Sequence, residues 1–382
     1  MRSSGRMPER LDRLAVPVVV APMAGGASTP ALVAAVNAAG GLGFLAAGYL
    51  TAAAVVEQIS RTSELTDRPF GVNLFVPAAP GDLAAVDAYR ERLRPEADRY
   101  DVRLPATVPD DRDDWDAKIA ALLADPVPVV SYTFGLPSTE EARALRAAGT
   151  LQIGTVTTAA EAAAAATAGM DALCVQGPAA GGHRGTFAVA DEPGRVPLGR
   201  LLGEVGAVTG LPLIAAGGLG DGPAVAAALR AGAVAVQLGT AYLRADESGA
   251  SAAHRAALVD GRFAGTVVTR AFTGRPARGL RNAFVDRYER HAPAAYPAVH
   301  HLTRPLRAAA AARGDAEGMH LWAGTAHRLA RTGPAAEITR ELWREAQSAL
   351  GGPTDEAATR AGSAAEGPGG AGSGPEGPVA ER

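Results

Sequence analysis

The stretch that determines the fold is residues 213–240, LIAAGGLGDGPAVAAALRAGAVAVQLGT. It contains an apolar segment at Leu213–Ala216, a glycine-rich turn, an alanine-rich segment that ends at Gly232, and a second apolar segment at Ala235–Leu238. Short apolar runs that alternate with helical stretches predict parallel strands joined by crossover helices. The glycine that ends the alanine-rich segment can adopt the left-handed conformation that often terminates a helix.

The same unit recurs through the preceding two hundred residues. Six further strands are predicted, at Val16–Ala21, Gly43–Ala47, Phe70–Val76, Val127–Thr133, Leu151–Val156 and Ala172–Gln176. With the two strands above, they make the eight units of an α/β fold of the (β/α)8 class, the TIM barrel.

The predicted domains follow from changes in composition along the chain. We expect a flexible N-terminus at 1–10, a barrel at 11–275 with a charged, proline-rich insertion at 77–126 after the third strand, a helical appendage at 276–350, and a disordered tail at 351–382. A helix is expected inside the insertion, at Asp114–Ala124. The tail consists largely of Gly, Pro, Ala, Ser and Glu, and such a composition buries too little apolar surface to become ordered.

Composition excludes several classes of function. The 37 basic and 40 acidic residues nearly cancel, so the chain has no long-range positive field for nucleic acid or anionic lipid. The single cysteine, Cys174, excludes a disulfide framework and a cysteine-based zinc site, and it indicates a reducing compartment. No stretch is long and apolar enough to span a bilayer. We expect a cytoplasmic enzyme with a small-molecule substrate and neither a nucleic-acid nor a membrane partner; the sequence leaves a homodimer open.

Residues at the carboxyl ends of the predicted strands are the candidates for the active site. They include no carboxylate and no lysine, which argues against a metal hydrolase and a Schiff-base aldolase, and we expect no metal. A bound cofactor would then supply the chemistry. An apolar pocket wall is predicted at Tyr49, Tyr132 and Phe134, although ordinary core packing explains each of them equally well.

Two glycine-containing loops predict a phosphate site. Gly217 and Gly218 follow the seventh strand, and Gly239 and Thr240 follow the eighth. Backbone amides and a helix dipole at such places can hold a phosphate without lysine or arginine. Ordinary tight turns are the alternative for either loop alone.

The sixth strand ends in QGPAAGGHRG, residues 176–185. Gln176 is suited to hydrogen bonds with the edge of a polar ring. Gly181 and Gly182 let the backbone approach a ligand closely. His183 is the only imidazole among the strand-end candidates, and it could take a proton near neutral pH or stabilise negative charge when protonated. A surface or capping histidine is the alternative.

These motifs together resemble the nitronate monooxygenases, formerly called 2-nitropropane dioxygenases, over about residues 16–282. The resemblance implies FMN as cofactor and His183 as the catalytic histidine. It places the flavin contacts at Met23, Ala24, Asn73, Gln176 and Gly181, and the phosphate contacts at Gly217, Gly218, Gln237, Leu238, Gly239 and Thr240. The segment 273–282, TGRPARGLRN, is similar to a family signature. The chain departs from the family's pattern at Ala179, where many relatives have glutamate.

The reaction that the resemblance implies is the oxidation of an alkyl nitronate by O2. FMN would accept an electron from the nitronate, oxygen would react with the reduced flavin or the substrate radical, and a carbonyl compound and nitrite would form. His183 would act as a base toward a neutral nitroalkane, or as a cation beside the anionic flavin and nitronate.

Three alternatives remain open at this point. One is an NAD(P)H-dependent quinone or enoyl-thioester reductase on the same barrel. Another is an isomerase or lyase for a phosphorylated substrate, and a third is a non-catalytic flavin carrier.

Overall fold

The computed structural model describes residues 14–79, 81–107 and 111–351. The flexible N-terminus predicted at 1–10 lies outside the described residues. So does the tail predicted at 351–382, except for Gly351, which is the last residue of a helix.

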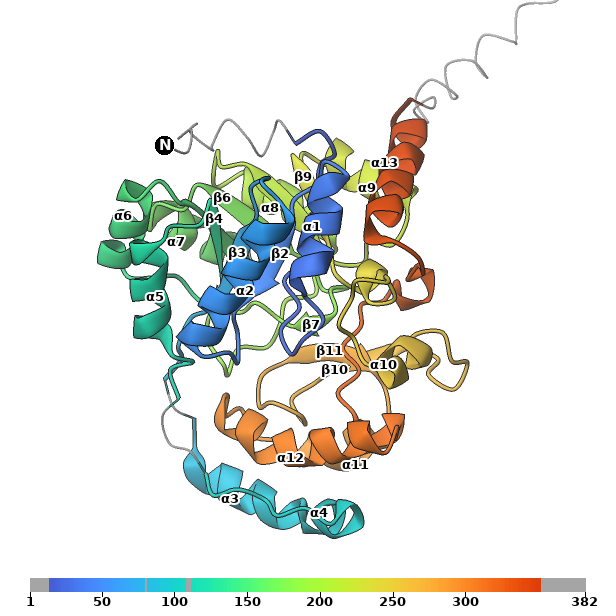
Figure 1. Cartoon of the computed structure of the whole chain (residues 1–382). Coiled ribbons are helices and arrows are strands. Elements are labelled where there is room, and N and C mark those ends of the chain that lie inside the picture. The colour runs from blue at the N-terminus through green and yellow to red at the C-terminus, as the bar shows by residue number, and fades with distance from the viewer. Residues whose placement is uncertain (1–13, 80, 108–110, 352–382) are drawn as a thin grey trace, which may run out of the picture.

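Eight parallel strands form the centre of the molecule (Figure 1). They are β1 (Val18–Val20), β2 (Phe44–Ala46), β3 (Gly71–Phe75), β4 (Val129–Thr133), β5 (Leu151–Val156), β6 (Ala172–Gln176), β8 (Leu213–Ala216) and β9 (Ala235–Leu238). The order is β1-β9-β8-β6-β5-β4-β3-β2, and a parallel bridge between Val19 and Leu42 joins the two ends. The predicted (β/α)8 barrel is therefore confirmed. Its strands are buried on both faces, which explains why they read as continuous apolar runs.

Seven helices cover the barrel between its strands. They are α1 (Pro30–Ala38), α2 (Ala52–Leu65), α5 (Trp115–Ala124), α6 (Thr139–Ala147), α7 (Ala159–Thr167), α8 (Leu198–Gly206) and α9 (Gly222–Arg230). Local sequence fixes several of the starts. Ser138 and Glu141 form a capping box at α6, and Thr158 and Glu161 form another at α7.

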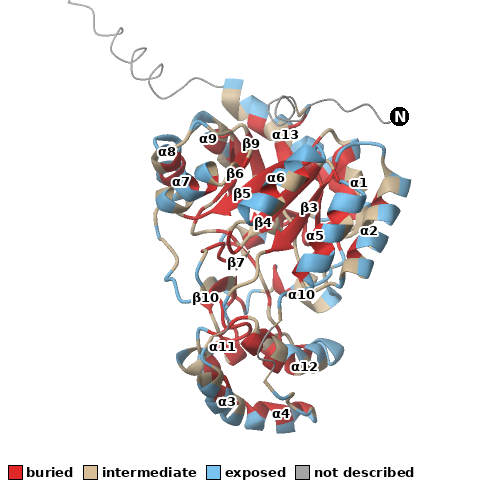
Figure 2. Ribbon diagram, turned by 90° about the vertical axis from the view of Figure 1, so that its left-hand side faces the viewer, coloured by how far each residue is buried: buried red, intermediate tan, exposed pale blue. Residues whose placement is uncertain are grey.

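A second body, which we call the cap lobe, lies at the carboxyl ends of the strands (Figures 1 and 2). It contains α3 (Leu83–Arg92), α4 (Arg94–Tyr100), α10 (Ala252–Ala257), α11 (Ala283–Tyr288), α12 (Ala298–Ala312), β10 (Thr266–Thr269) and β11 (Ala277–Leu280). Its core is separate from that of the barrel and includes Tyr89, Phe272, Phe284 and Leu302. Buried Glu96 of α4 forms ion pairs with Arg99 and with Arg287 of α11.

Short elements complete the fold. The strand β7 (Gly182–His183) pairs with β11, which ties the loop after β6 to the cap lobe. Four 3₁₀ helices are η1 (Thr240–Tyr242), η2 (Glu289–His291), η3 (Ala316–Gly318) and η4 (His327–Leu329). No helix in the described ranges is long and apolar enough to cross a membrane.

The last helix, α13 (Ala335–Gly351), returns to the barrel and lies beside α9 (Figure 1). Its buried residues Ile338, Leu342 and Ala346 repeat at a spacing of four and join the barrel's own core. The segment for which we predicted a helical appendage, 276–350, is thus divided in the structure between the cap lobe and the barrel. The predicted insertion at 77–126 is divided too, because α3 and α4 lie in the cap lobe and α5 covers the barrel.

Candidate active site

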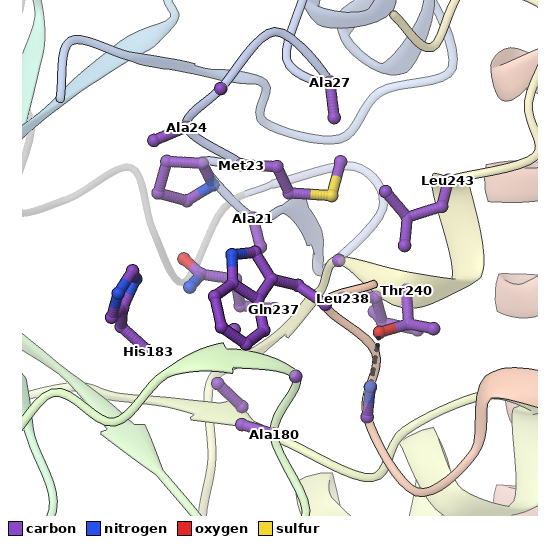
Figure 3. Close-up of a pocket in the computed structure, with 18 of the residues that line it drawn as sticks. Ala21, Met23, Ala24, Ala27, Ala180, His183, Gln237, Leu238, Thr240 and Leu243 are labelled. Atoms are coloured by element: carbon purple, nitrogen blue, oxygen red, sulfur yellow. Dashed lines mark hydrogen bonds between the residues drawn. The ribbon is translucent and has the colours of Figure 1, made fainter. Parts of the chain in front are cut away.

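A cavity of about 370 Å³ lies between the carboxyl ends of the strands and the cap lobe. This size is typical of sites for small molecules and cofactors. Figure 3 shows Met23, His183, Gln237, Leu238 and Thr240 around the hollow. Of the residues predicted from sequence, the cavity is lined by Met23, Ala24, Tyr49, Asn73, Gln176, Gly181, His183, Gly217, Gly218, Gln237, Leu238, Gly239 and Thr240.

Two predicted wall residues do not line the cavity, and for them the prediction is wrong. Tyr132 is fully buried in the barrel's outer core, where its hydroxyl donates to Gln152 Oε1 at 2.9 Å. Successive side chains of a strand point to opposite faces, so its neighbours Ser131 and Thr133 line the cavity instead. Phe134 lies behind the wall, with its ring 5.5 Å from that of His183.

The loops after β8 and β9 present unused backbone donors. The amides of Gly217, Gly218 and Gly239 donate no hydrogen bond to any residue that the structure describes. Gly217 and Gly218 have φ of +109° and +76°, and a Cβ on Gly217 would lie 2.9 Å from Ala180 N. The start of α9 is occupied by the Asp221 carboxylate, which accepts from Ala224 N. The loop amides, and not the end of this helix, are therefore free to hold a phosphate.

Gly181, in the loop after β6, allows this loop to approach residues 323–325 closely. A Cβ on Gly181 would lie 2.6 Å from Ala323 C and would overlap Gly324 N. Gly324 N donates to Thr240 Oγ1 at 3.0 Å, the dashed line in Figure 3. Ala179 O accepts from Thr325 N at 3.1 Å, and the Ala179 methyl group faces Gly218. Four loops, those after β6, β8 and β9 and residues 323–325, thus surround one end of the cavity.

Gln176 and Asn73 are both already engaged in hydrogen bonds. Gln176 Nε2 donates to His183 O at 3.0 Å, and its Oε1 accepts from Gly185 N at 2.9 Å. The side chain therefore fixes the loop that bears His183. Asn73 Nδ2 donates to Ser131 Oγ at 2.9 Å, and Asn73 Oδ1 accepts no hydrogen bond from the described residues, which leaves it available to a ligand donor.

His183 is held by one hydrogen bond and surrounded by aromatic rings. Its Nε2 lies 2.9 Å from Thr273 Oγ1, and the Thr273 hydroxyl donates to Arg275 O at 3.2 Å. The hydroxyl proton is therefore used, so we assign the imidazole proton to Nε2. Nδ1 has no partner among the described residues and keeps its lone pair. The ring centroids of Trp322 and Tyr296 lie 5.5 and 5.9 Å away.

The His183 imidazole is neutral at physiological pH. Burial among these rings lowers its pKa to about 3, and the positive charges of Arg275 and Arg307 contribute to the shift. Of the two roles left open by the sequence, the neutral base agrees with this environment better than the resting cation.

Cys174 also lines the cavity but is not a nucleophile. Its sulfur accepts a hydrogen bond from Gln237 Nε2 at 3.3 Å, and burial raises the pKa of the thiol to about 12. The protonated thiol is a small buried hydrophobe.

Several site residues were missed by sequence reasoning. The cavity is also lined by Leu243, His254, Met319, His320 and Trp322. Thr273 hydrogen-bonds His183, and the charge of Arg275 lowers the pKa of its imidazole. Except for Leu243, they come from segments beyond the barrel's strands, so strand-end position gave no signal for them. The one available signal was the TGRPARGLRN segment, which contains Thr273 and Arg275.

The fold and the cavity define the class: an enzyme of the (β/α)8 barrel type, with one histidine and two phosphate-compatible loops at the carboxyl ends of its strands. Residues 9–345 match the family model for nitronate monooxygenase. The chain belongs to the nitronate monooxygenase family, which is flavin-dependent.

Individual relatives agree with this assignment. A probable nitronate monooxygenase of Staphylococcus aureus is 37% identical over 349 residues, which cover 90% of this chain and 97% of that protein. A nitroalkane oxidase of Streptomyces ansochromogenes is 51% identical, with a TM-score of 0.85 and coverage of 89% and 98%. FabK of Thermotoga maritima is 28% identical, with a TM-score of 0.69 and coverage of 90% and 96%.

Proposed function

We propose that this enzyme binds FMN and oxidises alkyl nitronates with O2 to carbonyl compounds and nitrite. The observation that supports the proposal best is a neutral imidazole, His183, facing a cavity that also presents the free amides of Gly217, Gly218 and Gly239. The overall conversion balances as two nitronates and one O2 giving two carbonyl compounds and two nitrite ions.

The residues present are suited to FMN. The free loop amides would hold its phosphate. Asn73 Oδ1 and the amide of Ala24, which donates to no residue in the described ranges, would meet the polar edge of its ring. Bound flavin supplies the electron transfer that no side chain here can supply. Phe75, Trp322 and Met23 line the cavity and would exclude water from the reacting atoms.

His183 would take a proton from a neutral nitroalkane at Nδ1, while Nε2–H stays bonded to Thr273. The nitronate that forms carries a negative charge next to the new imidazolium, which offsets the low proton affinity of the partly buried ring. A nitronate supplied directly needs no proton removed. The imidazole is therefore more important for nitroalkanes than for nitronates.

The test is an anaerobic stopped-flow experiment on the purified holoenzyme, mixed separately with propyl-2-nitronate and with NADH while flavin absorbance is followed. We expect fast reduction by the nitronate alone and nitrite release on aeration. Reduction by NADH alone would place the enzyme among the reductases, and a protein without flavin absorbance would refute the cofactor. Homodimer formation stays a prediction that gel filtration can check.

A further inference from the structure

Three arginine side chains, those of Arg184, Arg275 and Arg307, are buried near His183 without a carboxylate partner among the described residues. Arg184 donates to the carbonyl oxygens of Gln176 and Gly177, and the charges that lower the pKa of the His183 imidazole are those of Arg275 and Arg307. The exposed fraction is 0% for Arg275 and 6% for Arg307. Arg275 donates only to the carbonyl oxygens of Thr186 and Phe187, at 3.1 and 3.3 Å, and its Nε has no partner within the described chain. Burying a charge is costly unless an opposite charge is near, so these two guanidinium groups call for an anion.

Arg307, on α12, has only neutral partners. Its Nε donates to Thr303 Oγ1 at 3.1 Å, and its Nη2 lies 2.9 Å from His300 O and 3.2 Å from His300 Nδ1. Burial lowers the pKa of both Arg275 and Arg307 to about 10, which still leaves both side chains charged at neutral pH.

One ring separates the Arg275 guanidinium from His183, and two rings separate the Arg307 guanidinium from the cavity. The Arg275 guanidinium is 4.0 Å from the ring centroid of Phe134, whose other neighbours include His183. On the Arg307 side, the His300 ring stacks on Tyr49 at 3.9 Å, and Tyr49 lines the cavity. Phe134 and His300 are buried, so bulk water screens the two positive charges only weakly.

We propose that Arg275 and Arg307 are fixed counter-charges for an anionic substrate bound beside His183, and that the imidazole is neutral when this anion binds. They are positioning residues, because neither guanidinium touches the cavity and each acts through intervening rings. The inference rests on the proposed function in naming a nitronate as the anion. It adds that the positive charge comes from the buried guanidinium groups and not from the histidine.

The proposal determines how anion binding depends on pH. The charged and titratable groups around His183 are Arg275, Arg307, His300, His320, Tyr49 and Tyr296. The carboxylates of Asp191 and Glu161 act on Arg275 from a greater distance and form no ion pair with it. Burial lowers the pKa of both other histidines well below the usual value, and it raises that of Tyr49 to about 12 and that of Tyr296 further. Asp113, bonded to Tyr49 N, has a pKa raised by burial to about 6. No group in this set therefore changes charge between pH 7 and pH 9.

The first test uses the unmodified holoenzyme and nitrate, a planar, redox-inert anion. Nitrate is titrated at pH 7, 8 and 9 while the flavin spectrum or the heat of binding is followed. We expect Kd to stay within about twofold, since the guanidinium groups keep their charge. An affinity that falls about tenfold for each pH unit would identify an imidazolium as the cation and would overturn the proposal.

The second test compares variants. Arg307→Gln and Arg275→Gln should each weaken nitrate binding by about tenfold, and Arg307→Lys, which keeps the charge, by no more than about threefold. Arg313→Gln is the matched control, because Arg313 is an exposed cation at the end of the same helix, bonded to Arg99 O and Tyr100 O. Flavin content and melting temperature identify the folded variants.

A folded glutamine variant of either arginine that binds nitrate as tightly as the wild type would overturn the proposal. If neither glutamine variant folds, the pH titration of the unmodified enzyme decides. Nitrate binding involves no turnover, so a protein that binds nitrate as expected but is not reduced by nitronates would refute the proposed function and leave this inference standing.

Discussion

Thr273 is the residue whose replacement tests the role of His183 most sharply. Its side chain is 1% exposed, and its hydroxyl links His183 Nε2, at 2.9 Å, to Arg275 O, at 3.2 Å. Thr273→Val keeps the branched shape and removes both of these hydrogen bonds, together with the longer one that the hydroxyl accepts from Arg275 N at 3.4 Å. Each buried group left without a partner costs about 1–3 kcal/mol, so we expect the free energy of unfolding to fall by about that amount.

The effect on catalysis should depend on the substrate. Without Thr273 the imidazole can rotate or shift its proton, and Nδ1 no longer points its lone pair at the substrate. If the loss of orientation raises the activation free energy of proton transfer by about 1.4–2.8 kcal/mol, flavin reduction by a neutral nitroalkane slows by roughly 10- to 100-fold. Reduction by the preformed nitronate needs no proton transfer and should slow by less than about threefold.

The assay is anaerobic stopped-flow reduction with nitroethane and with ethylnitronate, each at saturating concentration. Thr273→Ser keeps the hydroxyl and serves as the control, with rates close to the wild type for both substrates. Equal slowing with both substrates would refute the reasoning, because it would mean that Thr273 supports the site in general and not the base. Unchanged rates with both would show that its hydrogen bond does not orient His183.

Three further predictions follow from the same structure. Gly181→Ala should release flavin during gel filtration, because the added Cβ would displace Ala323 and Gly324. The control Gly261→Ala has open space around it and should retain flavin, and equal retention by the two variants would contradict the predicted clash. Cys174 should resist alkylation by iodoacetamide at pH 8, since burial raises its pKa to about 12, and a mass shift in the folded protein would count against this. Burial lowers the folded-state pKa of His183 to about 3 and that of His254 to about 4, both below the unfolded value of 6.5. Above pH 6.5 both states are neutral and stability is complete; as the pH falls toward 4, the unfolded chain takes up protons that the folded chain does not, and the free energy of unfolding falls by about 1.4 kcal/mol per pH unit for each histidine. Urea unfolding at pH 7, 6 and 5 measures this loss, and a flat profile would refute it.

The sequence predicts the second half of the barrel better than the first. The strands expected at Leu151–Val156, Ala172–Gln176, Leu213–Ala216 and Ala235–Leu238 have the observed bounds. The first strand, expected at Val16–Ala21, is shorter in the structure, Val18–Val20. Pro17 and Pro22 flank it, and proline has no N–H to donate to a neighbouring strand.

The site is predictable only where strand order brings its residues together. Position at a strand end led to His183 and to the glycine-containing loops after β8 and β9, all of which line the cavity, because parallel strands place their carboxyl ends at one rim. It placed Tyr132 on the wrong face, since one residue of displacement along a strand reverses the side chain. Thr273, Arg307 and Trp322 reach the site through the packing of the cap lobe, and no local pattern encodes that packing.

The cap lobe is assembled from two parts of the chain that are far apart. Glu96 of α4 meets Arg287 of α11 across 191 residues, and most of the barrel is encoded between them. Loops of this length close slowly during folding. On the ribosome, α3 and α4 emerge early with apolar faces that have no partner until α12 has been synthesised. The cap lobe must therefore form late, and the barrel's catalytic rim stays open to solvent until α12 has been synthesised.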